Sequence, residues 1–171
     1  YMYVGVRSTK EMSSFRVNKK AGSLSHIRTI GLEADPCYIS TDRTGNYLLA
    51  AYYSAGHVSV HPIGPHGDVS GPAIEWLATA NKAHCVQMDT SNRFTFVPHV
   101  GESNVIHQFD FDEQTGKLTQ NETPWVLGQK GFGPRHYAYH PTLDMIYFDN
   151  EQGCSVTAYA LDRSTGTVEA M

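Results

Sequence analysis

The sequence predicts an all-β protein built from a repeated unit of antiparallel strands, and two sets of recurring residues support this prediction. Glycine turns, each followed two positions later by an aliphatic residue, recur at intervals of 45, 49 and 50 residues, and short apolar runs recur at nearly the same interval. Such turns join antiparallel strands, and no segment shows a sustained helical period. The turns are Gly22-Ser23-Leu24, Gly67-Asp68-Val69, Gly116-Lys117-Leu118 and Gly166-Thr167-Val168. The runs are Tyr1-Met2-Tyr3-Val4, Tyr47-Leu48-Leu49-Ala50, Phe94-Thr95-Phe96-Val97 and Met145-Ile146-Tyr147-Phe148.

Each repeat divides into four predicted strands, and the recurring run is the second of them. The first strand precedes it across a polar turn, at Cys37-Tyr38-Ile39, His84-Cys85-Val86 and His136-Tyr137-Ala138. An alternating third strand follows, at Ser14-Phe15-Arg16-Val17, Val58-Ser59-Val60, Val105-Ile106-His107-Gln108-Phe109 and Val156-Thr157-Ala158-Tyr159. The fourth strand is the least distinct, with its best examples at Ile74-Glu75-Trp76-Leu77 and Trp125-Val126-Leu127.

Four short strands in each unit of about 50 residues are typical of a β-propeller blade. A β-sandwich also contains alternating strands, but it does not require the same positions to recur four times. The chain opens on the second strand of one blade and stops at the fourth strand of another. That makes about three and a half blades, whereas propellers close with about 4–8. We therefore expect residues 1–171 to form a single domain, a partial β-propeller truncated at both ends. An open arc leaves unpaired strand edges, so the alternative is that the chain self-associates with another copy.

Composition excludes several classes of protein. Apolar residues make up 40% of the 171 residues and charged residues 18%, which is ordinary for a folded domain. The formal net charge of −4 argues against a nucleic-acid partner. No apolar run approaches the roughly 20 residues that cross a bilayer, so no membrane partner is expected. Three cysteines without a pairing pattern favour the cytoplasm over an oxidising compartment; they are Cys37, Cys85 and Cys154.

The repeat also predicts which residues share one mouth of the propeller channel. The loop entering the first strand of a blade and the loop leaving the second strand open on the same face. Entering residues are Cys37, His84 and Arg135, and leaving residues are Arg7, Tyr53, Val100 and Glu151. Charged and titratable residues here depart from the small or apolar residues of a structural position, which indicates a functional site. We therefore expect Arg7, His84, Arg135 and Glu151 to surround this mouth. Strand alternation points His136, one position further in, to the other side.

A cluster of positive groups in an acidic chain suits an anionic small molecule, because arginine binds carboxylate or phosphate bidentately. Structural alternatives remain: Arg135 capping backbone carbonyls, His84 as a hydrogen-bonded core residue, and Glu151 as only the ion-pair partner of Arg135. Zinc-ligand spacing, a nucleophile elbow and a phosphate-binding glycine loop are all missing, so neither a metal site nor a cofactor is predicted. Other histidines are assigned to surface or strand positions, namely His57, His61, His66, His99, His107 and His140.

At these positions the sequence resembles the lactonase family of seven-bladed β-propellers, which contains propeller-type 6-phosphogluconolactonases and 3-carboxy-cis,cis-muconate lactonizing enzymes. The matching motifs follow the family's order and spacing and are Tyr3-Val4-Gly5-Val6-Arg7, Ala83-His84-Cys85-Val86, Gly133-Pro134-Arg135-His136 and Asn150-Glu151. The resemblance implies part of a seven-bladed ring, in which a further active-site arginine belongs to a later blade. It also implies that His84, Arg135 and Glu151 are catalytic. Arg7 and His136 are added as substrate-binding candidates. Lys82 departs from the second histidine that some members carry, which weakens a role for that position.

The resemblance implies a lactone hydrolase that converts 6-phospho-D-glucono-1,5-lactone to 6-phosphogluconate in the pentose phosphate pathway, without a metal or another cofactor. The partner is then an anionic small-molecule lactone. In this interpretation His84 takes a proton from the attacking water, while Arg135 stabilises the oxyanion or holds the phosphate. Glu151 orients Arg135 or shares the role of base. Two alternatives stay open: a muconate lactonizing enzyme, which the opening Tyr3-to-Arg7 run favours less, and a propeller that binds a ligand without turnover.

Overall fold

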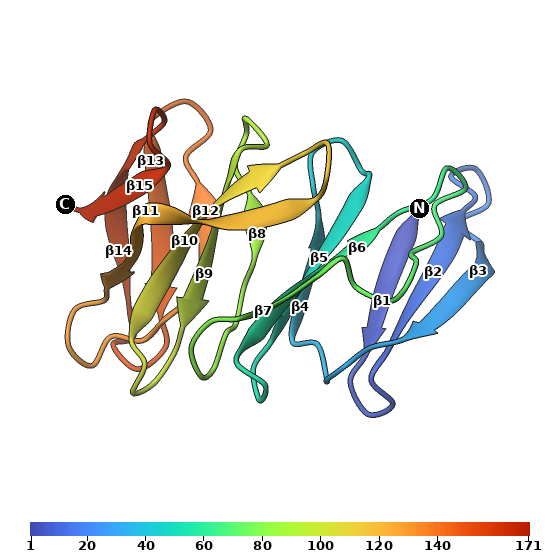
Figure 1. The fold of residues 1–171 in the computed structure, drawn as a ribbon, viewed down its shortest axis with the longest axis horizontal. Coiled ribbons are helices and arrows are strands. Elements are labelled where there is room, and N and C mark those ends of the chain that lie inside the picture. The colour runs from blue at the N-terminus through green and yellow to red at the C-terminus, as the bar shows by residue number, and fades with distance from the viewer.

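A computed structural model describes residues 1–171 as fifteen β-strands in four antiparallel sheets, here called blades I to IV (Figure 1). Within every blade the strands lie side by side in chain order. Blade I contains β1 (Met2–Val6), β2 (Glu11–Val17) and β3 (Leu24–Gly31). Blade II contains β4 (Tyr38–Thr41), β5 (Tyr47–Tyr52), β6 (His57–Pro62) and β7 (Glu75–Ala78). Blade III contains β8 (Gln87–Met88), β9 (Phe94–His99), β10 (Val105–Asp112) and β11 (Lys117–Leu127). Blade IV contains β12 (Pro134–Tyr139), β13 (Met145–Asn150), β14 (Ser155–Asp162) and β15 (Thr167–Ala170).

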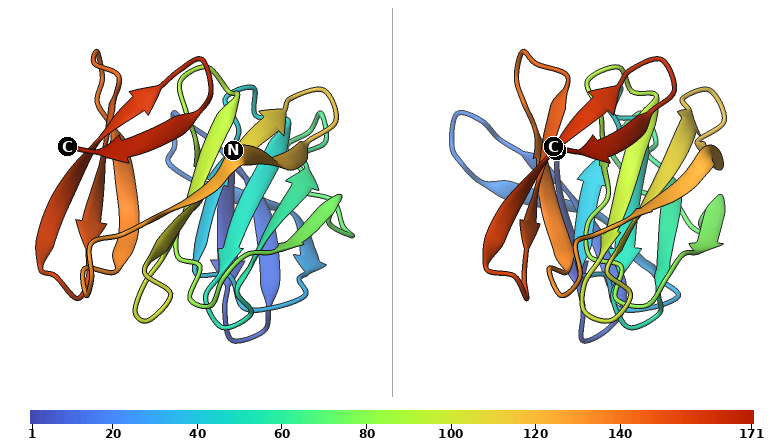
Figure 2. Two further views of the ribbon diagram at one scale, coloured as in Figure 1. Left: turned by 60° about the vertical axis from the view of Figure 1, so that its left-hand side comes forward. Right: turned by 90° about the vertical axis from the view of Figure 1, so that its left-hand side faces the viewer.

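The predicted repeat is confirmed. Blades II, III and IV each have four strands, and blade I has the three that correspond to the second, third and fourth strands of the others. The blades follow one another from the N-terminal to the C-terminal end, and blade IV stands apart at one end in the turned view of Figure 2. No helix in the structure is long and apolar enough to cross a membrane.

The hydrophobic core lies between successive blades, as strands with two buried faces require. Met12 and Tyr52 belong to the cluster between blades I and II, and Leu49 packs with Phe109 between blades II and III. A third cluster joins blades III and IV around Phe96 and Phe148. The first strands lie against the next blade: β4 lies beside β8, the first strand of blade III, and β12 lies beside β9, the second strand of blade III, so the first strands form the inner edge of the arc.

Polar turns join blades II and III at the end of the first strands. Asp42 accepts hydrogen bonds from Tyr47 N at 2.9 Å and from Asn92 Nδ2, in the equivalent turn of blade III, at 3.1 Å. Arg43 donates from Nε to Asp89 O and from Nη2 to Met88 O, both at 2.8 Å. We call this group, Asp42, Arg43, Asp89 and Asn92, the turn clasp. It explains why these turns are polar: their side chains satisfy backbone groups that the strands leave unpaired.

One first strand differs from its prediction. The run His84-Cys85-Val86 was expected to form the first strand of blade III, but β8 begins at Gln87. Its partner strand β9 contains Pro98, which has no N–H to donate to the ladder. The pairing is reduced there to a bond from His84 N to Pro98 O at 3.0 Å and an isolated bridge between Ala83 and His99. The residues that enter blade III are consequently positioned by loop contacts.

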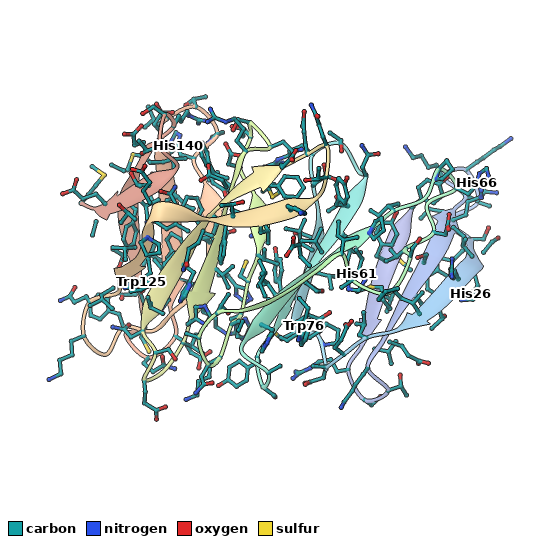
Figure 3. The ribbon with its side chains drawn as sticks, viewed as in Figure 1. His26, His61, His66, Trp76, Trp125 and His140 are labelled. Atoms are coloured by element: carbon teal, nitrogen blue, oxygen red, sulfur yellow. The ribbon has the colours of Figure 1, made fainter.

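Two histidines that the sequence assigned to surface or strand positions lie in strands and are fully buried. They are His61 in β6 and His99 in β9, whereas Figure 3 shows His66 and His140 at opposite ends of the molecule. The His99 ring lies 5.0 Å from that of His107, and its Nε2 has no hydrogen-bond partner. Burial, reinforced by His107, lowers the pKa of His99 to about 3.

Acid is therefore expected to destabilise the fold through His99. Histidine has an ordinary pKa of about 6.5, so His99 binds a proton in the unfolded chain as the pH falls through that value. In the folded chain His99 does not bind the proton until about pH 3. The free energy of unfolding consequently decreases over that range. Urea unfolding at pH 7 and pH 4.5 measures the decrease, which His99→Gln should make smaller. His66→Gln, at an exposed histidine, is the matched control, and an unchanged slope in His99→Gln would contradict the assignment.

Candidate active site

Arg135 and Glu151 meet at one rim of blade IV, as the hairpin geometry predicts. The register pairs Pro134, at the start of β12, with Asn150, at the end of β13. Glu151 N donates to Gly133 O at 2.9 Å, which closes the rim. Gly133 has a φ of +65°, a conformation that favours glycine. The Arg135 Nε lies 2.7 Å from Glu151 Oε2, with both side chains about two-fifths exposed, at 38% and 42%.

This contact is an ion pair without the geometry of a hydrogen bond, since the buried Nε of Arg135 has no hydrogen-bond partner. The guanidinium is thus held by charge and keeps N–H groups available for another acceptor. Arginine and glutamate exposed to this degree exchange partners at small cost, because solvent screens the attraction. The pair can therefore open toward a bound anion.

His84 enters the same rim from the loop between β7 and β8. His84 is 9% exposed, and its ring lies edge-on to two others, with its centroid 4.7 Å from that of His136 and 5.8 Å from that of Tyr53. The Nδ1 of His84 is buried and has no partner in the protein. The pKa of His84 is lowered to about 4, chiefly by burial and then by the nearby Arg135 and His136, while a backbone hydrogen bond and Glu151 act in the opposite direction. His84 is therefore a neutral imidazole at pH 7, able to accept a proton.

The prediction that His136 points to the other side of its strand was wrong. A register shift lies between Pro134 and Tyr137 in β12, and it rotates the intervening residues out of simple alternation. His136 consequently faces His84, and its Nδ1 lies 3.5 Å from Arg135 Nη1 and 3.6 Å from Asp149 Oδ2. Asp149 also accepts a hydrogen bond from His136 N. The bulge thus adds a second imidazole to the rim.

Arg7 stands apart from this group. It follows β1 and pairs with Asp35, Nη2 to Oδ2 at 2.8 Å, and its side chain is 59% exposed. The hydrogen bond that Arg7 donates to the Asp35 carboxylate raises the pKa of Arg7. No hydrogen bond or ion pair joins Arg7 to the other four candidates, which are His84, Arg135, His136 and Glu151. The structure therefore assembles four of the five predicted residues at blades III and IV and leaves Arg7 on blade I, with blade II in between.

Three further side chains belong to the site and were missed in the sequence. Asp149 holds His136, and its position two residues before Glu151 on the same strand was a usable signal. Tyr53, taken as a structural residue, packs against His84. Gln152 donates from Nε2 to Glu151 Oε1 at 2.8 Å and accepts from Gly101 N at 2.9 Å. Nothing in the repeat pattern marks Gln152, because its contact crosses between blades. The site brings no three His, Cys, Asp or Glu side chains into an arrangement that could hold a metal ion.

The whole chain, residues 1–171, matches the lactonase family, described as a seven-bladed β-propeller. The chain belongs to the lactonase family. This lactonase-family chain is 35% identical over 169 residues to the 6-phosphogluconolactonase of Pectobacterium carotovorum subsp. carotovorum, covering 99% of the chain and 50% of that relative. It is also 35% identical over 156 residues to the 6-phosphogluconolactonase of Xenorhabdus nematophila, covering 91% and 46%.

A solved structure supports the fold of this lactonase-family chain. The periplasmic gluconolactonase of Pseudomonas aeruginosa superposes with a TM-score of 0.84 at 22% identity, over 94% of the chain and 48% of that protein. The chain spans about half the length of the curated relatives it matches.

Proposed function

We propose that the protein is a lactone hydrolase that converts 6-phospho-D-glucono-1,5-lactone to 6-phosphogluconate, a step of the pentose phosphate pathway. The observation that carries this proposal is the neutral His84 beside the Arg135–Glu151 pair, in a chain that belongs to the lactonase family. Relatives named as 6-phosphogluconolactonases, which cover nearly all of the chain, support the choice of substrate.

In this proposal His84 acts as the general base. A neutral imidazole has one ring nitrogen without a proton, and a water molecule hydrogen-bonded to that nitrogen can attack the lactone carbonyl. The proton passes from water to the imidazole as the tetrahedral intermediate forms, and then to the ring oxygen as the C–O bond breaks. His136 faces the His84 ring and serves as a substrate-binding group, and Arg7 contributes positive charge from blade I.

Arg135 supplies electrostatic stabilisation in the same step. Its guanidinium has N–H groups that Glu151 leaves free, and they can donate hydrogen bonds to the carbonyl oxygen as negative charge develops on it. Glu151 orients the guanidinium, and Gln152 in turn orients Glu151. Donors held in position before the reaction stabilise a transition state without a cost of reorganisation.

We propose that the protein is cytoplasmic. Cys37, Cys85 and Cys154 are free thiols, which agrees with a cytoplasmic enzyme. We treat residues 1–171 as one domain of partial propeller structure, and self-association stays a prediction that the particle mass in solution checks.

The proposal is tested by turnover. Purified protein mixed with freshly prepared 6-phospho-D-glucono-1,5-lactone should release 6-phosphogluconate well above the spontaneous rate, as followed by a coupled dehydrogenase. 3-Carboxy-cis,cis-muconate serves as the comparison substrate. Conversion of the muconate with none of the lactone would replace the proposal with the lactonizing reaction, and conversion of neither would overturn it.

Arg135→Lys is expected to lower kcat by about tenfold to a hundredfold, because lysine keeps the charge but loses the planar donor pair. The measurement is steady-state hydrolysis of the 6-phospholactone. Arg28→Lys is the matched control. Arg28 is an exposed residue of β3 in blade I, and its Nη1 lies 3.8 Å from Asp68 Oδ2. A variant with the parent kcat would show that the Arg135 guanidinium is structural.

A further inference from the structure

A second cleft opens beside the Arg135–Glu151 pair, and no hydrophobic residue lines it. It has a volume of about 580 Å³ and is lined by Lys82, Glu102, Asn104, Lys130, Gln152 and two glycines. Loops of blades III and IV supply the walls. The rest of the chain offers no other hollow whose lining combines two lysines.

The cleft shares a wall with the candidate active site. Gln152 lines the cleft, donates to Glu151 Oε1 at 2.8 Å and accepts from Gly101 N at 2.9 Å. Lys82 lies two residues before His84 on the same loop. When the reacting group of a ligand lies at His84 and Arg135, the other end of that ligand can therefore reach this cleft.

Lys82 is held in place by the structure. Its backbone has a φ of +65°, in the left-handed region that few residues other than glycine adopt. The N–H donates to Tyr53 O at 3.1 Å, and the carbonyl accepts from Val100 N at 3.3 Å. The side chain then crosses Gly101 so closely that a Cβ there would lie 2.7 Å from Nζ. Gly101 thus leaves the path along which the ammonium group reaches the cleft.

The lysines are the uncommitted donors of the cleft. Asn104 uses Nδ2 on the carbonyls of Gly128 and Gln129, and its Oδ1 accepts from Gly133 N. The side chain of Asn104 is therefore used to fix the loop that carries Lys130, and it is not available to bind a ligand. Lys82 Nζ has one partner, Glu102 Oε2 at 3.4 Å, and that glutamate is 96% exposed. An ion pair of this exposure contributes little, so a multiply charged anion can displace Glu102.

We propose that this cleft binds the phosphate group of the substrate, with Lys82 as the principal contact and Lys130 as the second. The inference rests on the proposed function, whose substrate carries a phosphate at the end opposite the reacting carbonyl. Compact ammonium groups bind phosphate as point charges. The cleft then selects the 6-phospholactone over the unphosphorylated lactone, and Glu102 weakens that selection by competing for Lys82.

Binding of two products that differ only in the phosphate tests the inference. Calorimetric titration compares 6-phosphogluconate with gluconate on the protein, on Lys82→Met and on Glu102→Gln. The unaltered protein should bind 6-phosphogluconate at least about tenfold more tightly than gluconate, as for a charge-assisted contact. Lys82→Met should remove most of that ratio, and Glu102→Gln should increase it. Lys20→Met, at an exposed lysine in the turn between β2 and β3, should leave it unchanged.

Equal affinity of the unaltered protein for the two acids would overturn the inference, as would a ratio that neither Lys82→Met nor Glu102→Gln alters. Turnover separates this result from the fate of the proposed function. Protein that binds 6-phosphogluconate selectively but hydrolyses neither lactone keeps the phosphate site and loses the lactonase assignment. Protein that hydrolyses 6-phospholactone and glucono-1,5-lactone with equal kcat/KM keeps the lactonase assignment and loses the phosphate site.

Discussion

Replacement of His84 by glutamine is expected to lower kcat/KM for the 6-phospholactone by about 10²–10⁴-fold, the usual contribution of a general base. Glutamine fills similar space between Tyr53 and His136, so packing is preserved, but its amide does not accept a proton. The substitution thereby removes the basic ring nitrogen of the neutral imidazole. Steady-state kinetics with the 6-phospholactone give the ratio directly.

The pH profile makes this assignment specific. In the free enzyme His84 must be neutral to accept a proton, so kcat/KM should fall as the pH is lowered through about 4, where the imidazole becomes protonated. The residual activity of His84→Gln should lack that acid limb. Circular dichroism at each pH identifies the points that belong to folded protein, and His66→Gln is the control. Parent activity in His84→Gln, or an identical acid limb, would show that another group is the base.

Tyr137→Phe is expected to lower the free energy of unfolding by about 2–3 kcal/mol, a large loss for one oxygen atom. The Tyr137 hydroxyl is buried between blades III and IV. It accepts from Gln87 N at 2.7 Å and lies 2.8 Å from both Gln87 O and Phe96 O, donating to one at a time. Tyr139 Oη, 3.2 Å from Gln87 O, can satisfy that acceptor. Gln87 and Phe96 are register partners at the end of the β8–β9 ladder, so the substitution removes the hydroxyl that joins blade IV to both strands and leaves buried polar groups there with fewer hydrogen bonds.

Urea unfolding at pH 7 measures this loss. Tyr147→Phe is the matched control, because the Tyr147 hydroxyl has only a 3.9 Å contact with Met145 Sδ. The control should change stability by less than about 0.5 kcal/mol, as most substitutions away from buried polar groups do. Equal stability changes in the two variants would mean that the Tyr137 hydroxyl does not join the blades. Both variants leave Arg135 and His136 unchanged. Their hydrolysis of the 6-phospholactone therefore shows whether the site depends on the contact of Tyr137 with blade III.

The repeat pattern predicted the blades because it depends on local chemistry. Glycine turns such as Gly116 and Gly166 have φ values of +73° and +70°, and the aliphatic residues after them fall on buried faces. The meeting of Arg135 and Glu151 was predictable for the same reason, since both follow from one hairpin. His84 could be placed at that mouth because the same column recurs in each blade.

Other features of the site depend on interactions that no single repeat contains. The bulge that turns His136 toward His84 cannot be read from alternation. The short β8 follows from one proline on the adjacent strand, and Gln152 acts through a glycine of another blade. Arg7 illustrates the limit of column reasoning, because Asp35, a local partner, binds its guanidinium. The place of each residue in the blade repeat was thus predictable from the sequence, whereas the side-chain partner of each residue was not.

The turn clasp has a consequence for how such a protein diversifies. Arg43 and Asn92 fasten neighbouring blades at the end where first strands finish, whereas His84 and Arg135 lie at the end where they begin. Mutations at the mouth therefore leave this fastening intact, and mutations in the fastening leave the reacting groups untouched. Effects at well-separated positions add independently. Changes in loop residues at the mouth are accordingly expected to add to the stability that the turn clasp contributes without altering it.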